Sequence, residues 1–415
     1  MTAMPHARNS SRLAGAISLQ LFSKNSGSDR YALSAELRKL SPVFVSPLGT
    51  VVLSRYQDCL ELLKSQDFEV ESAEWRDASR PGWREYAGIS DFYQCMLFRD
   101  PPDHTRLRRL ISGAFTRRRV EELRPSVEAQ VARALDTIAR LGEDGSAVDL
   151  YPELTFPLPI AVIADLLGVP EEDRETFHDV AHDFVALTEP ACTAEELLRA
   201  ETALGRLRAY FEELVARRRA APQDDLTSAL VTVHDTDGDR LDGEELIQTL
   251  VMVFIAGFET TVNLLGNGIV ALLEHPEAAA ELRQDPALAE AVVDEVLRYD
   301  TPVQYVGRRA VRDTRIADVP VPKGAAVIAV LGAANRDPAR FPDPDRFDIH
   351  RTGTRPASFG SGIHYCIGAA LGRMEAEIVF SALLTRFPRL AAAKPPVRSA
   401  AINMNGFYEI PVTLN

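Results

Sequence analysis

The sequence predicts a mainly α-helical protein with a small β subdomain, and three observations support this fold class. Long segments repeat apolar residues at three- and four-residue spacing, which is the period of an amphipathic helix. Strand-like runs are short and few, and the chain contains neither internal repeats nor low-complexity tracts. The 415 residues are 46% hydrophobic and 26% charged, which is the composition of an ordinary globular protein.

The helical periodicity is clearest in the middle of the chain. We expect helices at residues 120–141, 194–219, 242–273 and 287–299, and strands at residues 43–53, 309–330 and 407–414. Asp242 and Glu245 offer a capping pair at the start of the third helix. Pro and Gly cluster at residues 338–362, where interleaved aromatic residues and arginines indicate a long ordered loop. Residues 30–415 are therefore predicted to form one continuous domain.

Residues 1–29 are predicted to be a lead-in to this domain. Arg8 and Arg12 precede a short apolar stretch, as in a secretory signal, but Ser18 and Gln20 interrupt the stretch and no clear cleavage site follows it. We therefore expect an amphipathic or disordered segment rather than a signal peptide.

Charge and cysteine content exclude several classes of protein. The 60 acidic and 46 basic residues give a net charge of −14, which argues against a dedicated nucleic-acid binder. No segment has the ~18 uninterrupted apolar residues that a membrane span needs. The four cysteines are too few and too scattered for a disulfide framework or a paired zinc site. We expect a cytoplasmic monomer with no nucleic-acid or membrane partner.

Cys366 stands in an unusual setting, between Phe359 and Gly368 in the sequence FGSGIHYCIG. A helix-forming run begins just after it, and a helix N-terminus stabilises a thiolate. Glycines such as Gly360 leave the backbone bare, so that a flat, bulky partner can approach closely. A single thiolate among backbone donors suits an axial ligand of haem iron. The other three cysteines are expected to be buried as small hydrophobic residues.

The pattern Phe359-x-x-Gly-x-His364-x-Cys366-x-Gly368 resembles the haem-thiolate cytochrome P450 monooxygenases in their soluble bacterial form. The resemblance covers roughly residues 30–415. It implies the family's triangular prism of helices enclosing haem b (iron protoporphyrin IX), with Cys366 as the iron ligand. It also implies that Phe359, Gly360 and Gly368 contact the cofactor.

The helix predicted at residues 242–273 carries Glu259 and Thr260 in the middle of an apolar stretch. Burying a carboxylate is costly unless it is paired or protonated, so its presence requires a reason. Gly257 would let a ligand press against the helix, and Thr260 can bond back to the Ala256 carbonyl. The resemblance implies that Glu259 and Thr260 relay protons during dioxygen activation, and that Ala256 and Gly257 contact the haem.

Two further motifs follow the family's order. Glu295 and Arg298 are one helical turn apart and can pair, and together with Arg346 they match the family's buried Glu–Arg–Arg triad, to which we assign a structural role. The segment DPPDHTRLR at residues 100–108 places two donor side chains on one helix face. By resemblance the haem propionates are held by four residues: His104, Arg108, Arg308 and His364. Arg309 is adjacent to Arg308, and strand register decides which of the two points inward.

Electron supply is expected from a separate protein, because no flavin motif is present. Six arginines fall at residues 106–119 of an acidic protein, which favours a basic dock for an acidic donor such as a ferredoxin over a merely solvated surface. A ferredoxin reductase using NAD(P)H would complete the chain, and O2 is the co-substrate.

The substrate is predicted only by class. By resemblance the aromatic-rich stretch at residues 75–98, which includes Phe92, covers the pocket, although aromatic core packing explains such a cluster equally well. Four further pocket residues are Val303, Gln304, Asn403 and Met404. Polar groups among apolar neighbours suit a large, mostly apolar secondary metabolite such as a polyketide or macrolide, to be hydroxylated or epoxidised. Two alternatives are a peroxide-driven haem-thiolate peroxygenase and a non-catalytic haem-binding protein.

Overall fold

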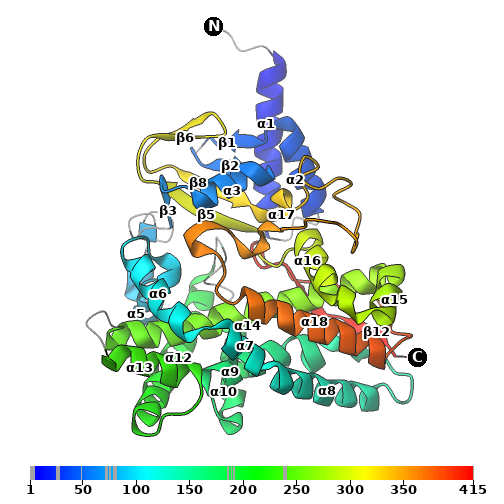
Figure 1. Ribbon diagram of the computed structural model, residues 1–415. Coiled ribbons are helices and arrows are strands. Elements are labelled where there is room, and N and C mark those ends of the chain that lie inside the picture. The colour runs from blue at the N-terminus through cyan, green and yellow to red at the C-terminus, as the bar shows by residue number, and fades with distance from the viewer. Residues whose placement is uncertain are drawn as a thin grey trace. The chain divides into compact units, whose positions relative to one another are not determined.

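The structure, a computed structural model, describes residues 5–414 except 25–28, 48, 71–72, 74–75, 78–81, 185–186, 188, 190–191 and 237–240. The chain divides into two compact units (Figure 1). Unit 1 comprises residues 1–72, 291–366 and 398–405, and unit 2 comprises residues 73–290, 367–397 and 406–415. Helices dominate and the sheets are small, so the predicted fold class is confirmed. One continuous domain from residue 30 stays a prediction.

Unit 1 is built on a five-stranded sheet with the order β1-β2-β8-β5-β3. Only β2 and β8 are parallel, with Val51 opposite Val327, and the other neighbours are antiparallel. The strands are β1 (Val43–Val45), β2 (Val51–Leu53), β3 (Phe68–Glu69), β5 (Tyr305–Ala310) and β8 (Ala326–Val330), and a separate hairpin contains β6 (Thr314–Ile316) and β7 (Val319–Val321). The first two predicted strand regions are confirmed.

The helices of unit 1 pack around this sheet. They are α1 (Pro5–Leu21), α2 (Arg30–Leu40), α3 (Tyr56–Lys64), α16 (Ala289–Tyr299, of which the first two residues belong to unit 2), α17 (Leu331–Ala334), η7 (Ala357–Phe359) and η8 (Gly362–His364). In α1, Ala14, Ile17 and Leu21 are buried in one cluster with Leu37 of α2 and Phe44 of β1. Within the described part of the lead-in, α1 is therefore an amphipathic helix with a buried apolar face.

Unit 2 is almost entirely helical. Its elements are η1 (Trp83–Glu85), α5 (Ala87–Phe92), η2 (Met96–Phe98), α6 (Asp103–Ala114), α7 (Arg117–Glu122), α8 (Arg124–Leu141), η3 (Tyr151–Thr155), α9 (Pro157–Leu167), η4 (Glu171–Asp173), α10 (Arg174–Ala181), η5 (His182–Phe184), α12 (Ala194–Ala220), α13 (Leu226–Thr236), α14 (Gly243–Glu274), α15 (Pro276–Gln284), η6 (Pro286–Leu288) and α18 (Ala369–Arg386). Residues 120–141 were predicted as one helix but belong to two. Helix α7 ends at Glu122, and α8 begins at Arg124 with Pro125 in its first turn.

Helix α14 is the core of unit 2 and packs against α9, α12 and α18. It begins with the expected capping box, in which Asp242 Oδ1 accepts from the Glu245 amide at 2.7 Å and Glu245 Oε2 accepts from the Asp242 amide at 3.0 Å. Among the described residues it is the one helix long and apolar enough to cross a membrane, but 78% of its apolar window is buried inside the protein. A buried core helix passes the same test of length and composition.

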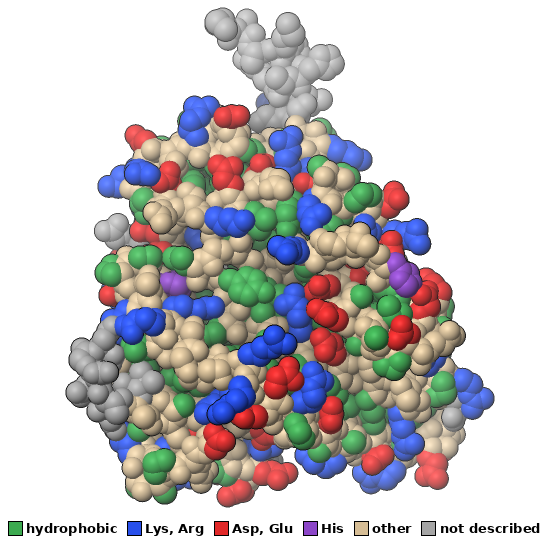
Figure 2. All heavy atoms as spheres, in the orientation of Figure 1, with side chains coloured by type: hydrophobic (Ala, Val, Ile, Leu, Met, Phe, Trp, Pro, Cys, Tyr) green, Lys and Arg blue, Asp and Glu red, His purple; other side chains and the backbone are tan. Residues whose placement is uncertain are grey.

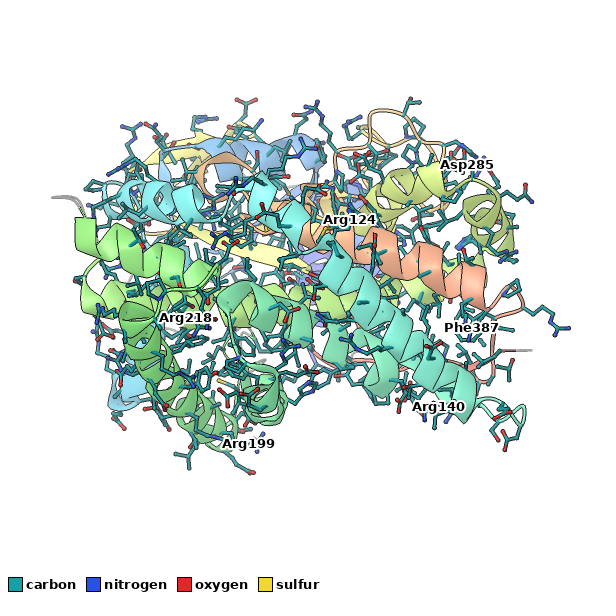
Figure 3. The ribbon with its side chains drawn as sticks, turned by 60° about the horizontal axis from the view of Figure 1, so that its bottom comes forward. Arg124, Arg140, Arg199, Arg218, Asp285 and Phe387 are labelled. Atoms are coloured by element: carbon teal, nitrogen blue, oxygen red, sulfur yellow. The ribbon has the colours of Figure 1, made fainter. Side chains whose placement is uncertain are left out.

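Helix α18 follows the cysteine loop in the chain and lies beside α8 (Figures 1 and 3). Arg124, at the start of α8, approaches Glu377 of α18, with Nη2 and Oε2 3.9 Å apart. A small sheet, β4 (Val148–Asp149), β12 (Pro411–Thr413) and β9 (Ala391–Ala392), closes this end of unit 2. The last strands are β10 (Val397–Arg398), at the junction of the units, and β11 (Phe407–Glu409), which confirms the strand region predicted near the C-terminus.

Candidate active site

The cysteine loop of unit 1 is held in a defined turn. The Cys366 amide donates to the Phe359 carbonyl at 2.9 Å, which closes the loop over η8. Gly360 and Gly362 adopt φ angles of +71° and +70°, which favour glycine. A Cβ on Gly362 would also lie 2.3 Å from the Leu63 carbonyl oxygen, so this position has room for glycine only. Gly368 is the N-cap of α18, which confirms the helix expected just after Cys366.

Burial separates Cys366 from two of the other cysteines. Cys59 and Cys95 are buried, and burial raises the pKa of both thiols, that of Cys95 to about 12. Cys366 is only partly covered. Within the described ranges no group of three or more His, Cys, Asp or Glu side chains could hold a metal ion alone.

The centre of α14 is interrupted by a short accessible stretch. Every residue from Leu246 to Leu272 is buried except Ala256, Gly257, Glu259 and Thr260. Ala256 is exposed, and the Thr260 hydroxyl donates to the Ala256 carbonyl at 3.0 Å. This bond holds the Thr260 hydroxyl beside the exposed Ala256. It also gives the Ala256 carbonyl a second hydrogen-bond donor besides the helical amide. A small residue and a hydroxyl thus mark the one place along the core of this helix that protein atoms leave uncovered.

Although Glu259 as a residue is only partly covered, its carboxyl group lies in desolvating surroundings, and this desolvation has a chemical consequence. It raises the pKa of this carboxyl to about 7, because the surroundings disfavour the charged form. Asn263 opposes the shift by donating from Nδ2 to Glu259 Oε1 at 3.4 Å, and the carboxylate of Glu189 reinforces it. Near neutral pH the group is therefore divided between its two protonation states, as a proton donor that must be reloaded requires.

Gly257 has a role in helix packing. A Cβ at this position would lie 2.7 Å from Cδ1 and 2.9 Å from Cγ1 of Ile163 in α9. The missing side chain therefore lets α9 pack closely against α14 within unit 2. The structure thus gives a helix-packing reason for this glycine, and the predicted contact of Gly257 with a cofactor stays a prediction.

The candidate propionate ligands are divided between the two units. In unit 2, His104 and Arg108 follow each other on one face of α6, with His104 buried and Arg108 partly exposed. In unit 1, β5 places Arg308 opposite Val327 and Arg309 opposite Ala326, so that the two arginines point to opposite faces of the sheet.

Hydrogen bonds distinguish these two arginines further. Arg309 Nε donates to the Gly324 carbonyl at 3.1 Å, which commits it to the β7–β8 turn. Arg308 donates to the Gly307 carbonyl at 2.7 Å and is the one that stays a candidate. His364 is the last residue of η8, two residues before Cys366.

The Glu–Arg cluster forms inside unit 1, but its third member differs from the prediction. Glu295 and Arg298 are buried and joined by two bonds of 2.7 Å. The second guanidinium near Glu295 belongs to Arg351, with Nε 3.4 Å from Oε2. Arg346 contributes only its carbonyl, which accepts from Arg298 at 2.9 Å, so the prediction of its side chain was wrong. A third contact, from the Asp348 amide to Glu295 at 2.8 Å, ties the loop at residues 344–351 to α16.

The predicted pocket residues lie in both units. In unit 2, Phe92 is buried against Phe98 and borders a small pocket whose lining also includes Asp91, Arg208 and Gln248. In unit 1, Val303 forms a β-bridge with Met404.

The polar groups of Gln304 and Asn403 are already used within unit 1. Gln304 Nε2 donates to the Thr301 carbonyl at 2.8 Å, and Asn403 Oδ1 accepts from the Tyr305 amide at 3.1 Å. The side-chain amides of Gln304 and Asn403 are therefore both engaged in hydrogen bonds within the protein. Trp75, at the start of the stretch predicted to cover the pocket, lies outside the described residues.

Comparison with known proteins now bears on this geometry. The cytochrome P450 family model matches residues 17–400. The monooxygenase PikC of Streptomyces venezuelae is 43% identical over 326 residues, which cover 78% of this chain and 76% of PikC. The 6-deoxyerythronolide B hydroxylase of Saccharopolyspora erythraea is 36% identical over 405 residues, which cover 93% of this chain and 96% of the hydroxylase. The chain belongs to the cytochrome P450 family.

A solved structure agrees with this assignment. P450BioI, in its complex with a hexadec-9Z-enoic acid-ligated acyl carrier protein, superposes with a TM-score of 0.85 at 35% identity, covering 93% of this cytochrome P450 and 98% of the other chain. The protein is therefore a monooxygenase with the P450 fold, and its cofactor is haem b with an axial cysteine thiolate.

The residues of this cytochrome P450 fit such a cofactor. Cys366 is partly exposed and lies just before the N-terminus of α18, where a thiolate is stabilised. Cys192, which was expected to be buried, is also only partly covered and precedes α12, but the sequence around it lacks the glycines that flank Cys366. The glycines at 360 and 362 keep side chains off the loop in front of it. Ala256 and Thr260 leave part of α14 open to a ligand. Arg351 was missed because the loop holds several arginines, and only the path of the loop shows which one reaches Glu295.

Proposed function

We propose that this cytochrome P450 inserts one oxygen atom from O2 into a bulky, largely apolar small molecule, by hydroxylation or epoxidation. Cys366 is the axial thiolate, and the bound haem supplies the centre at which dioxygen is reduced and split. The observation that carries the proposal is the accessible stretch at residues 256–260 in the otherwise buried core of α14. A helix serving only to pack would not place a titratable carboxyl and a hydroxyl there.

Glu259 and Thr260 move protons in this proposal. The Glu259 carboxyl, with a pKa raised to about 7 by burial, holds a proton in part of the molecules at neutral pH and can release it. The Thr260 hydroxyl can accept one proton while donating another, and its bond to the Ala256 carbonyl fixes its position. Together the two groups relay protons in this proposal.

The remaining site residues bind and orient the cofactor. We assign the propionates to His104 and Arg108 from unit 2 and to Arg308 and His364 from unit 1, because a guanidinium can bind a carboxylate with two parallel bonds. Backbone and small side chains supply the other contacts, from Ala256, Phe359, Gly360 and Gly368. Glu295, Arg298 and Arg351 fix the loop that precedes the cysteine segment and do not act in the chemistry.

The electron donor is proposed to be a ferredoxin reduced by NAD(P)H through its reductase, docking on α6 and α7. Arg109, Arg117 and Arg118 are exposed there, and Lys and Arg side chains lie over this part of the face shown in Figure 2. Arg118 also pairs with Glu122 on the surface, and Arg106 and Arg119 are paired with Glu245 and Asp224. Reversing the charge of Arg117 and Arg118 should slow reduction by ferredoxin at low ionic strength, whereas Arg140→Glu on α8 should not. Equal effects would contradict this dock.

The substrate is proposed to be a polyketide or macrolide, in a cytoplasmic monomeric enzyme. The support is the similarity to an enzyme named for hydroxylating 6-deoxyerythronolide B. Holoenzyme with ferredoxin, reductase and NAD(P)H should be screened for macrolides that change the spin state of the iron. Turnover under isotopically labelled dioxygen should place one labelled atom in the product.

Two rival functions give different results in this assay. A peroxygenase would take its label from peroxide and not from dioxygen, and the Glu259–Thr260 pair speaks against it. A haem-binding sensor would bind ligands without consuming reductant. Product labelled from peroxide, or no reductant consumption with any ligand that binds, would overturn the proposal.

A further inference from the structure

Asn263 contacts Glu259 from the next turn of α14. Its Nδ2 lies 3.4 Å from Glu259 Oε1, and the residue is only 5% exposed. An amide nitrogen can only donate, so in this orientation it stabilises the ionised carboxylate more than the neutral acid.

Gly406 confines the amide of Asn263 from the other side. A Cβ on Gly406 would lie 1.9 Å from Asn263 Oδ1 and 2.6 Å from Cγ, closer than any real contact. The φ angle of Gly406 is not in the left-handed region, so its backbone conformation does not demand glycine. The glycine is therefore needed for space. It precedes β11, which packs against α14 within unit 2.

Two other titratable groups act on the same carboxyl. The carboxylate of Glu189, which is 3% exposed, disfavours ionisation of Glu259. Tyr151 of η3 interacts with Glu259 electrostatically, and burial, reinforced by that carboxyl, raises the pKa of its phenol. Asn263 is thus the group around Glu259 that favours the charged form, opposing both burial and Glu189.

We propose that Asn263, confined by the bare backbone of Gly406, is a positioning residue that orients the Glu259 carboxyl and sets the pH at which it exchanges its proton. The inference rests on the proposed relay role of Glu259. It adds Asn263 and Gly406, which are distant in the sequence and meet only in the folded protein. Together they keep Glu259 able to lose and regain a proton near neutral pH.

The titration of Glu259 tests this directly in the holoenzyme. The infrared band of its neutral carboxyl is identified by its loss in Glu259→Gln and followed against pH. Asn263→Ala should move the midpoint upward by about one pH unit, since a hydrogen bond to a charged group is lost. Gly406→Ala should move it in the same direction, because the new methyl group displaces the amide.

Two control variants separate positioning from packing. Gly266→Ala adds a methyl group on the same helix at an ordinary 3.5 Å from Ile410, and Asn267→Ala removes another buried amide one turn further along α14. Both should leave the midpoint unchanged. An unchanged midpoint in Gly406→Ala, or an equal shift in the controls, would overturn the inference.

Hydrogen peroxide released per NAD(P)H gives the second readout. The amount of peroxide released should rise in Glu259→Gln. In Asn263→Ala and Gly406→Ala it should differ from wild type, because the titration midpoint of Glu259 is shifted. If Glu259→Gln leaves it unchanged while the titration shifts are seen, the relay role fails and the positioning of the carboxyl stands. If Glu259→Gln raises it but the test variants do not shift the titration, the positioning fails and the relay stands.

Discussion

The raised pKa of Glu259 predicts that this residue destabilises the protein increasingly as the pH rises. The folded state holds the proton up to about pH 7, whereas the unfolded chain releases it near the ordinary pKa of 4.5. Stability that is complete below the unfolded pKa is therefore lost as the pH rises through the folded pKa. Replacing the acid with the neutral isostere in Glu259→Gln should remove this loss.

The size of the effect follows from the shift in pKa. Two to three pKa units correspond to about 3 kcal/mol at high pH, and the share that develops from about pH 5.5 to about pH 8.5 is about 2 kcal/mol. Urea unfolding of wild type and Glu259→Gln, at equal haem content, should show the variant gaining this amount over that range.

A matched control lies on the same helix. Glu274 is exposed at the end of α14, so Glu274→Gln should show no comparable gain. A difference between wild type and Glu259→Gln that is the same at both pH values would refute the reasoning.

Three further substitutions test other parts of the site. Thr260→Ala should raise the hydrogen peroxide released per NAD(P)H and lower product formation, on the order of 10²-fold, since a proton-transfer group is lost; equal coupling in both proteins would remove Thr260 from the relay. Gly362→Ala should cost about 2 kcal/mol or more and lower haem occupancy, because its Cβ would meet the Leu63 carbonyl. Gly353→Ala, with φ +65° but open space, should cost less, and equal costs would contradict the steric argument. Arg351→Gln should lower the melting temperature more than Arg346→Gln, because only the Arg351 side chain pairs with buried Glu295; the reverse order would restore Arg346.

Local sequence patterns predicted much of this protein. Apolar periodicity located α12, α14 and α16 to within a few residues, because a helix that buries one face must repeat every three or four residues. The loop before Cys366 could be predicted from the sequence, because Gly360 and Gly362 are required by the backbone conformation of the loop itself. The break between α7 and α8 was missed, although Pro125 was a visible signal for it.

Contacts between distant segments could not be predicted in the same way. The close approach of Ile163 on α9 to Gly257 on α14 has no sequence signal, because it depends on how the two helices pack. Arg346 and Arg351 are equally plausible partners for Glu295 until the path of the loop is known. The contact of Gly406 with Asn263 has no sequence signature at all, because it depends on how the C-terminal strand packs on α14.

The visible absorption spectrum of the reduced, carbon monoxide-treated holoenzyme tests the assignment of Cys366 most directly. Wild type, Cys59→Ala and Cys95→Ala should all show the red-shifted Soret band of a thiolate-ligated haem, and Cys366→His should lose it while still binding haem. A red-shifted band that survives in Cys366→His, or a haem-loaded wild-type protein without that band, would contradict the account.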